Sequence, residues 1–156
     1  MSPAVERKFL LDTNLFIQGF RDPQANVSLQ RFHQVFAPFE YLSVIVAQEL
    51  RAGVRSRADR RLLERYVLSV YRRRGRLVTP SARAWEDSGD VLAELGRRGG
   101  LDLSRVSKPF GNDVLLALSC RETGIVLVTD NERDFERIAR AVPFEFVKPW
   151  PAPSAA

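Results

Sequence analysis

The chain has 156 residues, of which 45% are apolar, and this size and composition are typical of one globular domain with a sizeable core. It has one cysteine, Cys120, and one histidine, His33, which excludes a disulfide framework and a zinc site built from these residue types. No apolar run approaches the roughly 18 residues of a membrane span. Residues 1–9 lack the apolar region of a secretory signal, so we expect a cytoplasmic protein.

The net charge of +5 is unevenly distributed along the chain. Residues 51–76 contain ten arginines and two acidic residues, a net charge of +8, whereas the rest of the chain has 14 basic and 17 acidic residues, or −3. Such a stretch is typical either of a solvated helix face or of a surface that binds a polyanion. Composition alone leaves both interpretations open.

Strand-like and helical patterns alternate along the chain. Apolar runs with strand character lie at 8–12, 36–43 (the weakest), 76–80, 124–130 and 144–147. Helical periodicity lies at 28–39, 43–53, 58–72, 81–97, 111–124 and 132–141. This alternation predicts an α/β fold, a three-layer α/β/α sandwich with a central, mostly parallel sheet. We expect a single domain over residues 1–150 and a disordered tail at 151–156.

Local signals set the expected helix boundaries. Ser43 is the expected N-cap of the helix at 43–53, and the helix at 81–97 is expected to stop at "RRGG". Asn112 is the expected N-cap of the helix that Gly124 terminates, and this helix is apolar almost all round. On the helix at 58–72, Tyr66 and Tyr71 fall on the apolar face, where we expect both in the core.

Several carboxylates lie in apolar surroundings. Asp12 and Asp130 end strand-like runs, Asp113 opens the buried helix, and Glu49 interrupts the apolar run "SVIVAQEL". Ligand sites of parallel sheets form beyond the carboxyl ends of the strands, and converging carboxylates repel one another unless a cation lies between them. Because only oxygen ligands are available, the cations indicated are Mg²⁺ or Mn²⁺.

Each acid taken alone also has a purely structural explanation. Asp12 fits the N-cap of a helix that starts near residue 14, and Asp113 fits the dipole of a first helical turn. Glu49 fits a solvated helix position, and Asp134 fits an ion pair with an arginine of its own short helix. The order of the acids along the chain is what weakens these separate explanations.

That order is familiar. "LLDTNLFI", "SVIVAQEL" and "NDVLLALSCRETGIVLVTDNERDF" closely resemble, in this order and spacing, the PIN-domain nucleases and especially the VapC-type toxins of bacterial toxin–antitoxin pairs. The resemblance covers residues 8–147 and implies a catalytic set of four acids: Asp12, Glu49, Asp113 and Asp134. Asp130 is the alternative for the fourth acid. The supporting polar side chains implied by the family pattern are Thr13, Asn14, Ser43, Thr129, Asp130 and Asn131.

The resemblance implies metal-assisted hydrolysis of RNA phosphodiester bonds. Asp12, Asp113 and Asp134 would be the metal ligands, with Glu49 as a more distant or second-metal ligand. The family also implies an RNA substrate, a small cognate antitoxin and a homodimer. Apolar residues of the helices at 28–39 and 58–72 are candidates for the partner surface, although a core role explains them equally well.

The resemblance favours RNA binding as the function of the arginine-rich residues 51–76. A carboxylate-lined site repels RNA unless nearby cations attract the backbone. The candidate RNA-binding residues are Arg51, Arg55, Arg61 and Arg65. We expect Cys120 in the core and His33 in a structural or surface position. The alternative function is a PIN-like module that binds RNA or a protein but cleaves poorly.

Overall fold

The computed structural model describes residues 6–98 and 102–153, so "MSPAV", the two glycines of the expected stop "RRGG" and the end of the expected tail lie outside the described residues. Five strands form one sheet in the order β3-β2-β1-β4-β5, and every pairing in it is parallel. The strands are β1 (Phe9–Leu11), β2 (Glu40–Ser43), β3 (Leu77–Val78), β4 (Val126–Val128) and β5 (Phe146–Val147). All five predicted strands are confirmed, each shorter than its apolar run.

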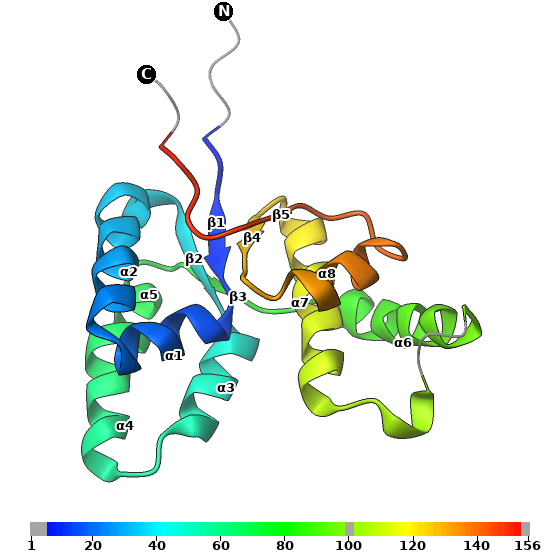
Figure 1. The fold of residues 1–156 in the computed structure, drawn as a ribbon, viewed down its shortest axis with the longest axis horizontal. Coiled ribbons are helices and arrows are strands. Elements are labelled where there is room, and N and C mark those ends of the chain that lie inside the picture. Colours follow the sequence, from blue (N-terminus) through cyan, green and yellow to red (C-terminus); the bar gives the residue numbers. More distant parts are fainter. Residues whose placement is uncertain (1–5, 99–101, 154–156) are drawn as a thin grey trace, which may run out of the picture.

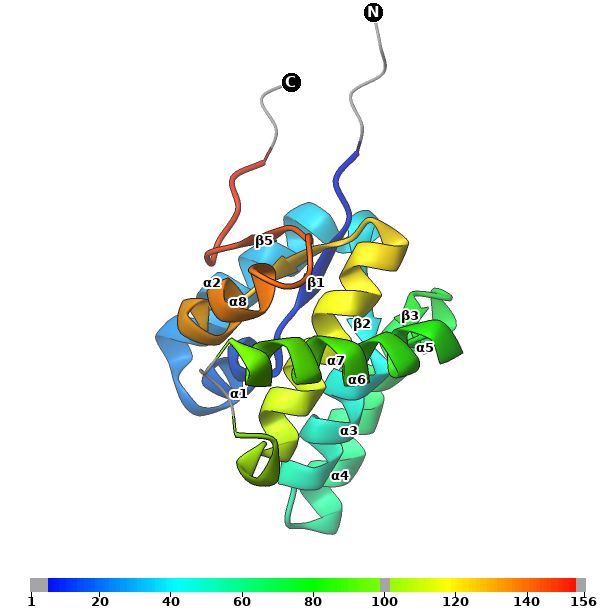
Figure 2. The same ribbon diagram turned by 90° about the vertical axis from the view of Figure 1, so that its right-hand side faces the viewer.

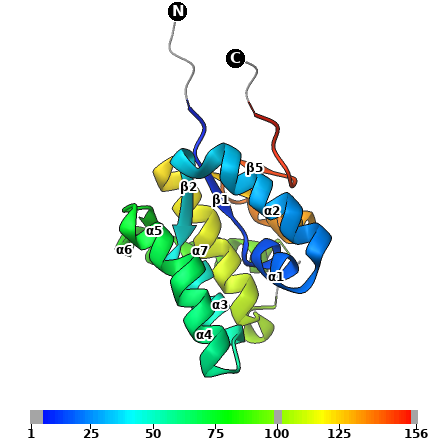
Figure 3. The ribbon, with the colours of Figure 1, turned by 90° about the vertical axis from the view of Figure 1, so that its left-hand side faces the viewer.

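Helices fill every connection between the strands, and Figure 1 shows α1, α2, α4 and α5 on one side of the sheet and α6, α7 and α8 on the other. Figure 2 faces the second group, and Figure 3 faces the first. The predicted three-layer sandwich is therefore confirmed. The α-helices are α1 (Thr13–Arg21), α2 (Pro23–Phe36), α3 (Val44–Gly53), α4 (Arg57–Leu63), α5 (Ser69–Arg73), α6 (Ala82–Arg97), α7 (Lys108–Thr123) and α8 (Glu132–Ala139). Shorter turns are η1 (Ala37–Phe39), η2 (Glu64–Leu68) and η3 (Leu103–Arg105).

The strand order places a crevice at the centre of the sheet. From β1 the chain proceeds outward to β2 and β3, whereas from β4 it proceeds outward to β5 on the other side. The connections that leave β1 and β4 therefore diverge, and in such sheets ligands bind where neighbouring strands send their connections in opposite directions. Leu10 pairs with Leu127 in the middle of the sheet, and both side chains are fully buried. Asp12 and Thr129 follow at the carboxyl ends of these two strands.

The expected start of the buried helix is wrong by several residues. Helix α7 begins at Lys108, because Ser107 caps it by accepting a hydrogen bond at its Oγ from the Phe110 N–H at 3.3 Å. A proline in the first turn suits this start, since its missing N–H has no helical partner there. Gly124 ends the helix at φ 67°, as predicted. Asp113 consequently lies in the second turn, beyond the strongest influence of the helix dipole.

The helix expected at 58–72 is helical throughout, but it contains a π turn, η2, in its middle. A π turn inserts an extra residue and rotates everything after it relative to what precedes it. Tyr71 is buried, as expected, whereas Tyr66 is 64% exposed, so the prediction that Tyr66 belongs to the core is wrong. Leu63 and Leu68 fill the core on this side, and Leu62 is exposed.

Helix α2 contains some of the apolar residues that were candidates for the partner surface. In α2, Leu29, Phe32 and Phe36 are buried, so these apolar residues of the region 28–39 belong to the core. No helix in the described ranges is long and apolar enough to cross a bilayer.

Candidate active site at the centre of the sheet

Asp12 lies at the carboxyl end of β1 with only 5% of its surface exposed. Its Oδ1 accepts a hydrogen bond from the backbone N–H of Thr13 at 2.8 Å, and its Oδ2 accepts one from the Thr129 hydroxyl at 2.7 Å. Burial raises the pKa of Asp12 above its ordinary value, while these two hydrogen bonds lower it in part. The expected capping role of Asp12 is confirmed, but only one of its oxygens serves the helix.

Glu49 reaches the same place from α3. The Thr13 hydroxyl donates to Glu49 Oε1 at 2.9 Å, so one threonine contacts Asp12 through its backbone and Glu49 through its side chain. Thr13 is buried and Glu49 is half-buried. The interpretation of Glu49 as a freely solvated helix residue is therefore wrong.

Asp113 is the most perturbed acid of the group. Burial, and to a smaller extent the charges of Asp12, Glu49 and Asp134, together raise the pKa of Asp113 from 3.8 to about 8. Carboxylates influence one another in this way only when they lie near each other with little water between them. Helix α7 thus places a carboxyl near Asp12 at the end of β1 and near acids of α3 and α8.

Asp134 joins the network through Asn131. The Asn131 side-chain amide donates to Asp134 Oδ2 at 3.1 Å, and the Asn131 backbone N–H donates to the Thr129 hydroxyl at 3.0 Å. Thr129 in turn donates to Asp12, so one chain of hydrogen bonds connects the first acid to the predicted fourth. In the ranges that the structure describes, Asp134 forms no ion pair with an arginine.

Asp130, the alternative fourth acid, has a different environment. It is exposed and accepts a hydrogen bond at Oδ2 from Gln18 Nε2 at 2.5 Å. Its charge acts on the pKa of Asp12, whereas the charge of Asp134 acts on that of Asp113. Asp134 therefore stays our prediction for the fourth acid.

Besides Asp130, two of the expected supporting residues lie outside this network of hydrogen bonds. Ser43 is fully buried and caps α3, accepting from the Ile45 N–H at 3.1 Å. Asn14 is exposed, and its side chain has no hydrogen-bond partner within residues 6–98 and 102–153. Thr13, Thr129 and Asn131 are the supporting residues that the structure brings together with the acids.

The donor set of this site suits a hard cation. The converging side chains offer carboxylate and hydroxyl oxygens, whereas Cys120 is buried in α7 with its thiol pKa raised to about 12, chiefly by burial. As the side chains stand, no three acidic, histidine or cysteine residues of the described ranges converge closely enough to coordinate an ion. The repulsion that contributes to the raised pKa of Asp113 is what a divalent cation would relieve.

The four candidate arginines differ in how far they are engaged. Arg51 Nη2 lies 2.8 Å from Glu64 Oε2, and Arg72 lies 2.6 Å from the other oxygen of the same carboxylate. These hydrogen bonds hold the pKa of Glu64 below its ordinary value. The guanidinium of Arg65 lies over the Tyr66 ring, 5.4 Å from its centroid. Arg55 and Arg61 form no ion pair in the described part of the chain.

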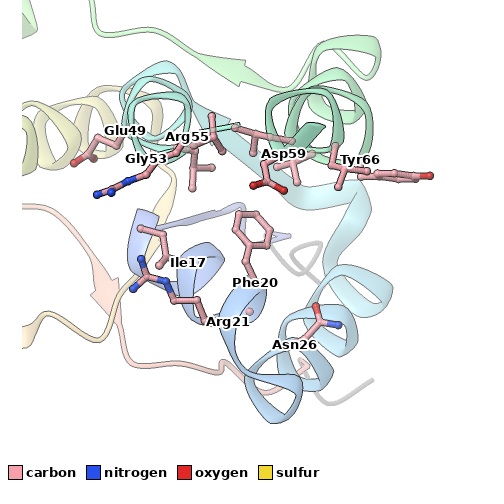
Figure 4. Close-up of a pocket in the computed structure, with 15 residues that line it drawn as sticks. Ile17, Phe20, Arg21, Asn26, Glu49, Gly53, Arg55, Asp59 and Tyr66 are labelled. Atoms are coloured by element: carbon pink, nitrogen blue, oxygen red, sulfur yellow. The ribbon is translucent and has the colours of Figure 1, made fainter. Parts of the chain in front are cut away.

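A groove of about 770 Å³ begins at Glu49 and runs between α1–α2 on one wall and α3–α4 on the other (Figure 4). Three of its lining side chains are large, apolar or aromatic, and more than half exposed: Phe20, Leu62 and Tyr66. A second hollow of about 490 Å³ shares Phe20 and Tyr66 with it. Exposed apolar side chains gathered in one concave surface are typical of a protein-binding site.

One buried polar cluster was not predicted. Glu40, at the amino end of β2, is 2% exposed and accepts hydrogen bonds from the Tyr71 hydroxyl at 2.5 Å and from His33 Nδ1 at 2.8 Å. It joins β2 to α5 and α2 at the end of the strand opposite the acids. His33 therefore has the structural role expected of it, and the signal that could have revealed Glu40 is an acid inside the strand-like run "FAPFEYLS".

Comparisons with known proteins agree with this geometry. The PIN domain family model matches residues 9–141. The tRNA(fMet)-specific endonuclease VapC of Shigella flexneri is 30% identical over 131 residues, which is 84% of this chain and 92% of that protein. Ribonuclease VapC2 of Haemophilus influenzae is 27% identical over 132 residues, with the same shares of the two chains.

Solved structures give the same result. A chain of the DNA-bound VapBC complex from Salmonella typhimurium matches 91% of this chain and 98% of its own length, with a TM-score of 0.66 at 25% identity. A chain of FitAB bound to a DNA fragment matches 95% of this chain and 99% of its own length, with a TM-score of 0.66 at 18% identity, and shares the fold. With the family model spanning nearly the whole sheet and its helices, the chain belongs to the PIN-domain family and is a VapC-type member of it.

Proposed function

We propose that this protein is an endoribonuclease toxin that hydrolyses RNA phosphodiester bonds at Asp12, Glu49, Asp113 and Asp134 with the help of Mg²⁺ or Mn²⁺. The observation that carries the proposal is Asp113, whose pKa is raised to about 8 among three other acids. Such an arrangement destabilises the empty fold, and strongly perturbed carboxyls of this kind are typical of functional sites.

The residues of the site would have two kinds of role, binding the cation and orienting the carboxylates. Asp12, Asp113 and Asp134 would hold the cation, which when bound supplies positive charge for the scissile phosphate and lowers the pKa of a bound water. Thr129 keeps the Asp12 carboxylate in one orientation through its 2.7 Å hydrogen bond, and Thr13 does the same for Glu49. The relevant compartment in this proposal is the cytoplasm.

The test is cleavage of a labelled single-stranded RNA pool by the wild type and by Asp113→Asn, each with Mg²⁺ or with EDTA. Glu136→Gln, an exposed acid of α8, is the matched control. Cleavage that requires both the metal and Asp113 supports the proposal, whereas cleavage that survives Asp113→Asn contradicts it. If no variant cleaves and Mg²⁺ leaves the melting temperature unchanged, the alternative of a PIN-like binding module replaces the nuclease.

We also propose that a small antitoxin covers the groove beside Glu49, and that the protein forms a homodimer. The related chains in the solved structures are parts of VapBC and FitAB complexes. The exposed Phe20, Leu62 and Tyr66 give the groove the apolar character that an amphipathic helix needs. Phe20→Ser is expected to weaken inhibition by the antitoxin while RNA cleavage by the free protein continues.

A further inference from the structure

Some arginines near the acids are engaged, that is, they already contact a carboxylate or an aromatic ring. Others form no such contact within the described residues, and we call these free. Arg51 belongs to the cluster around Glu64, where one carboxylate accepts from two guanidinium groups. Arg65 lies over an aromatic ring. An arginine with a partner loses that partner when it binds a phosphate, so engaged arginines contribute less to the affinity for RNA.

Two free arginines lie where the groove meets the acids. Arg21 is the last residue of α1 and Arg55 lies in the connection between α3 and α4, and both line the groove together with Glu49. Figure 4 shows them entering from opposite walls, with both guanidinium groups toward the Glu49 end. In the described ranges, neither side chain forms an ion pair or a hydrogen bond.

We propose that Arg21 and Arg55 form a clamp that holds a backbone phosphate of single-stranded RNA next to the phosphate that is cut. This inference rests on the proposed nuclease function and names two positioning residues for it, of which Arg21 carries no signal in the sequence. Guanidinium groups bind phosphate through paired hydrogen bonds, and a phosphate between two of them would offset the repulsion between their like charges. They also offset the repulsion that the acids exert on RNA.

The charges along the groove favour RNA at this end of it and disfavour RNA further along. Asp59 lines the groove together with Phe20 and Tyr66, away from Glu49 (Figure 4). A carboxylate there repels a second phosphate, while the exposed rings suit a protein. The RNA would therefore cross the groove only at its acidic end, which places one phosphate between the two arginines.

The experiment measures RNA binding in a variant that does not cut. Asp113→Asn is combined with Arg21→Gln, with Arg55→Gln and with both, and the Kd for a short labelled single-stranded RNA is measured by fluorescence anisotropy over a range of KCl concentrations. Each arginine that contacts a phosphate contributes about 0.7 to the slope of log K against log salt for a single strand. We expect each substitution to weaken binding about five-fold and to lower this slope by about 0.7.

Control variants separate a phosphate contact from a change in folding. Arg83→Gln, an exposed arginine of α6 that pairs with Asp87, is expected to leave the Kd and the slope unchanged. Arg21→Lys and Arg55→Lys are expected to keep most of the salt dependence but only part of the affinity for RNA, because lysine retains the charge without the paired hydrogen bonds. Melting temperatures within about 2 °C of the parent show that each fold is intact.

The clamp is overturned if the variant with both arginine substitutions binds RNA with the Kd and slope of Asp113→Asn alone. It is overturned too if Asp113→Asn shows no RNA binding at all. It is also overturned if the double variant loses affinity for the antitoxin while its RNA binding is unchanged. The nuclease proposal is judged separately by wild-type cleavage. If the wild type cleaves RNA but the double variant binds RNA with an unchanged Kd and slope, only the clamp is refuted.

Discussion

Asp113→Asn is expected to stabilise the metal-free protein while abolishing its activity. The substitution keeps the shape of the side chain and removes a charge that the fold holds against Asp12, Glu49 and Asp134. A residue that lowers the stability of its own fold and is nonetheless required for cleavage is selected for function rather than for folding.

The sign of the effect follows from proton binding. Because the pKa of Asp113 rises from 3.8 to about 8 on folding, the native state binds this proton more tightly than the unfolded chain does between these pH values. The contribution of Asp113 to the free energy of unfolding of the wild type therefore falls as the pH rises through this window and levels off above pH 8. Asparagine does not titrate, so the advantage of the variant is near zero at pH 4 and is largest above pH 8.

The magnitude has an upper limit and a smaller expected value. The rise of the Asp113 pKa from 3.8 to about 8 corresponds to an upper limit of roughly 5–6 kcal/mol. Water still reaches part of the Asp113 side chain and its neighbours can share the proton, so we expect about 2 kcal/mol. For a domain of this size, this is a rise in Tm of about 4–8 °C.

The assay is thermal and urea unfolding of both proteins in EDTA at pH 4.5 and pH 8.5. Glu136→Gln serves as the control, because this exposed acid of α8 lies outside the hydrogen-bonded network. Adding Mg²⁺ at pH 8.5 is expected to raise the Tm of the wild type more than that of Asp113→Asn. A variant that is no more stable than the wild type at pH 8.5, or equally stabilised at both pH values, would refute the reasoning.

Three further substitutions test the surroundings of the site. Thr129→Val leaves one Asp12 oxygen unpaired and is expected to cost about 2 kcal/mol in urea unfolding and at least ten-fold in cleavage, with Thr129→Ser close to the wild type. Tyr71→Phe leaves Oε1 of the buried Glu40 without its donor and is expected to cost about 2 kcal/mol, while cleavage by the folded protein stays unchanged. Gly19→Ala places a Cβ 2.6 Å from a leucine of α2, and is expected to lower stability by about 1 kcal/mol.

Most of the fold could be predicted because its signals are local. Strands such as β4 are short apolar runs bounded by turn residues, and the caps Ser43 and Gly124 mark helix ends by their own chemistry. The start of α7 could not be read in the same way, because Asn112 and Ser107 are both good caps. Phe110 is 8% exposed, and its burial is compatible with the start at Lys108, in which this residue already belongs to the helix.

Tyr66 shows a different limit of sequence reasoning. Its spacing of three residues from Leu63 and four from Val70 is that of one helical face, and a regular helix would bury it. In the structure Tyr66 lies within the π turn η2, where the regular helical spacing does not hold, and its side chain is at the surface. The Tyr66 side chain there lines the groove as one of its exposed rings.

The acids and the arginines differ in how much their sequence positions reveal. Asp12, Glu49 and Asp113 are recognisable because a carboxylate in an apolar segment is costly, so each is conspicuous even without its neighbours. An arginine in an arginine-rich stretch is inconspicuous, and its function depends on whether a partner such as Glu64 already engages it. Arg21 lies outside that stretch altogether and approaches the acids only because α1 runs along the groove. Sequence therefore predicts the chemistry of this site better than it predicts how the substrate is held there.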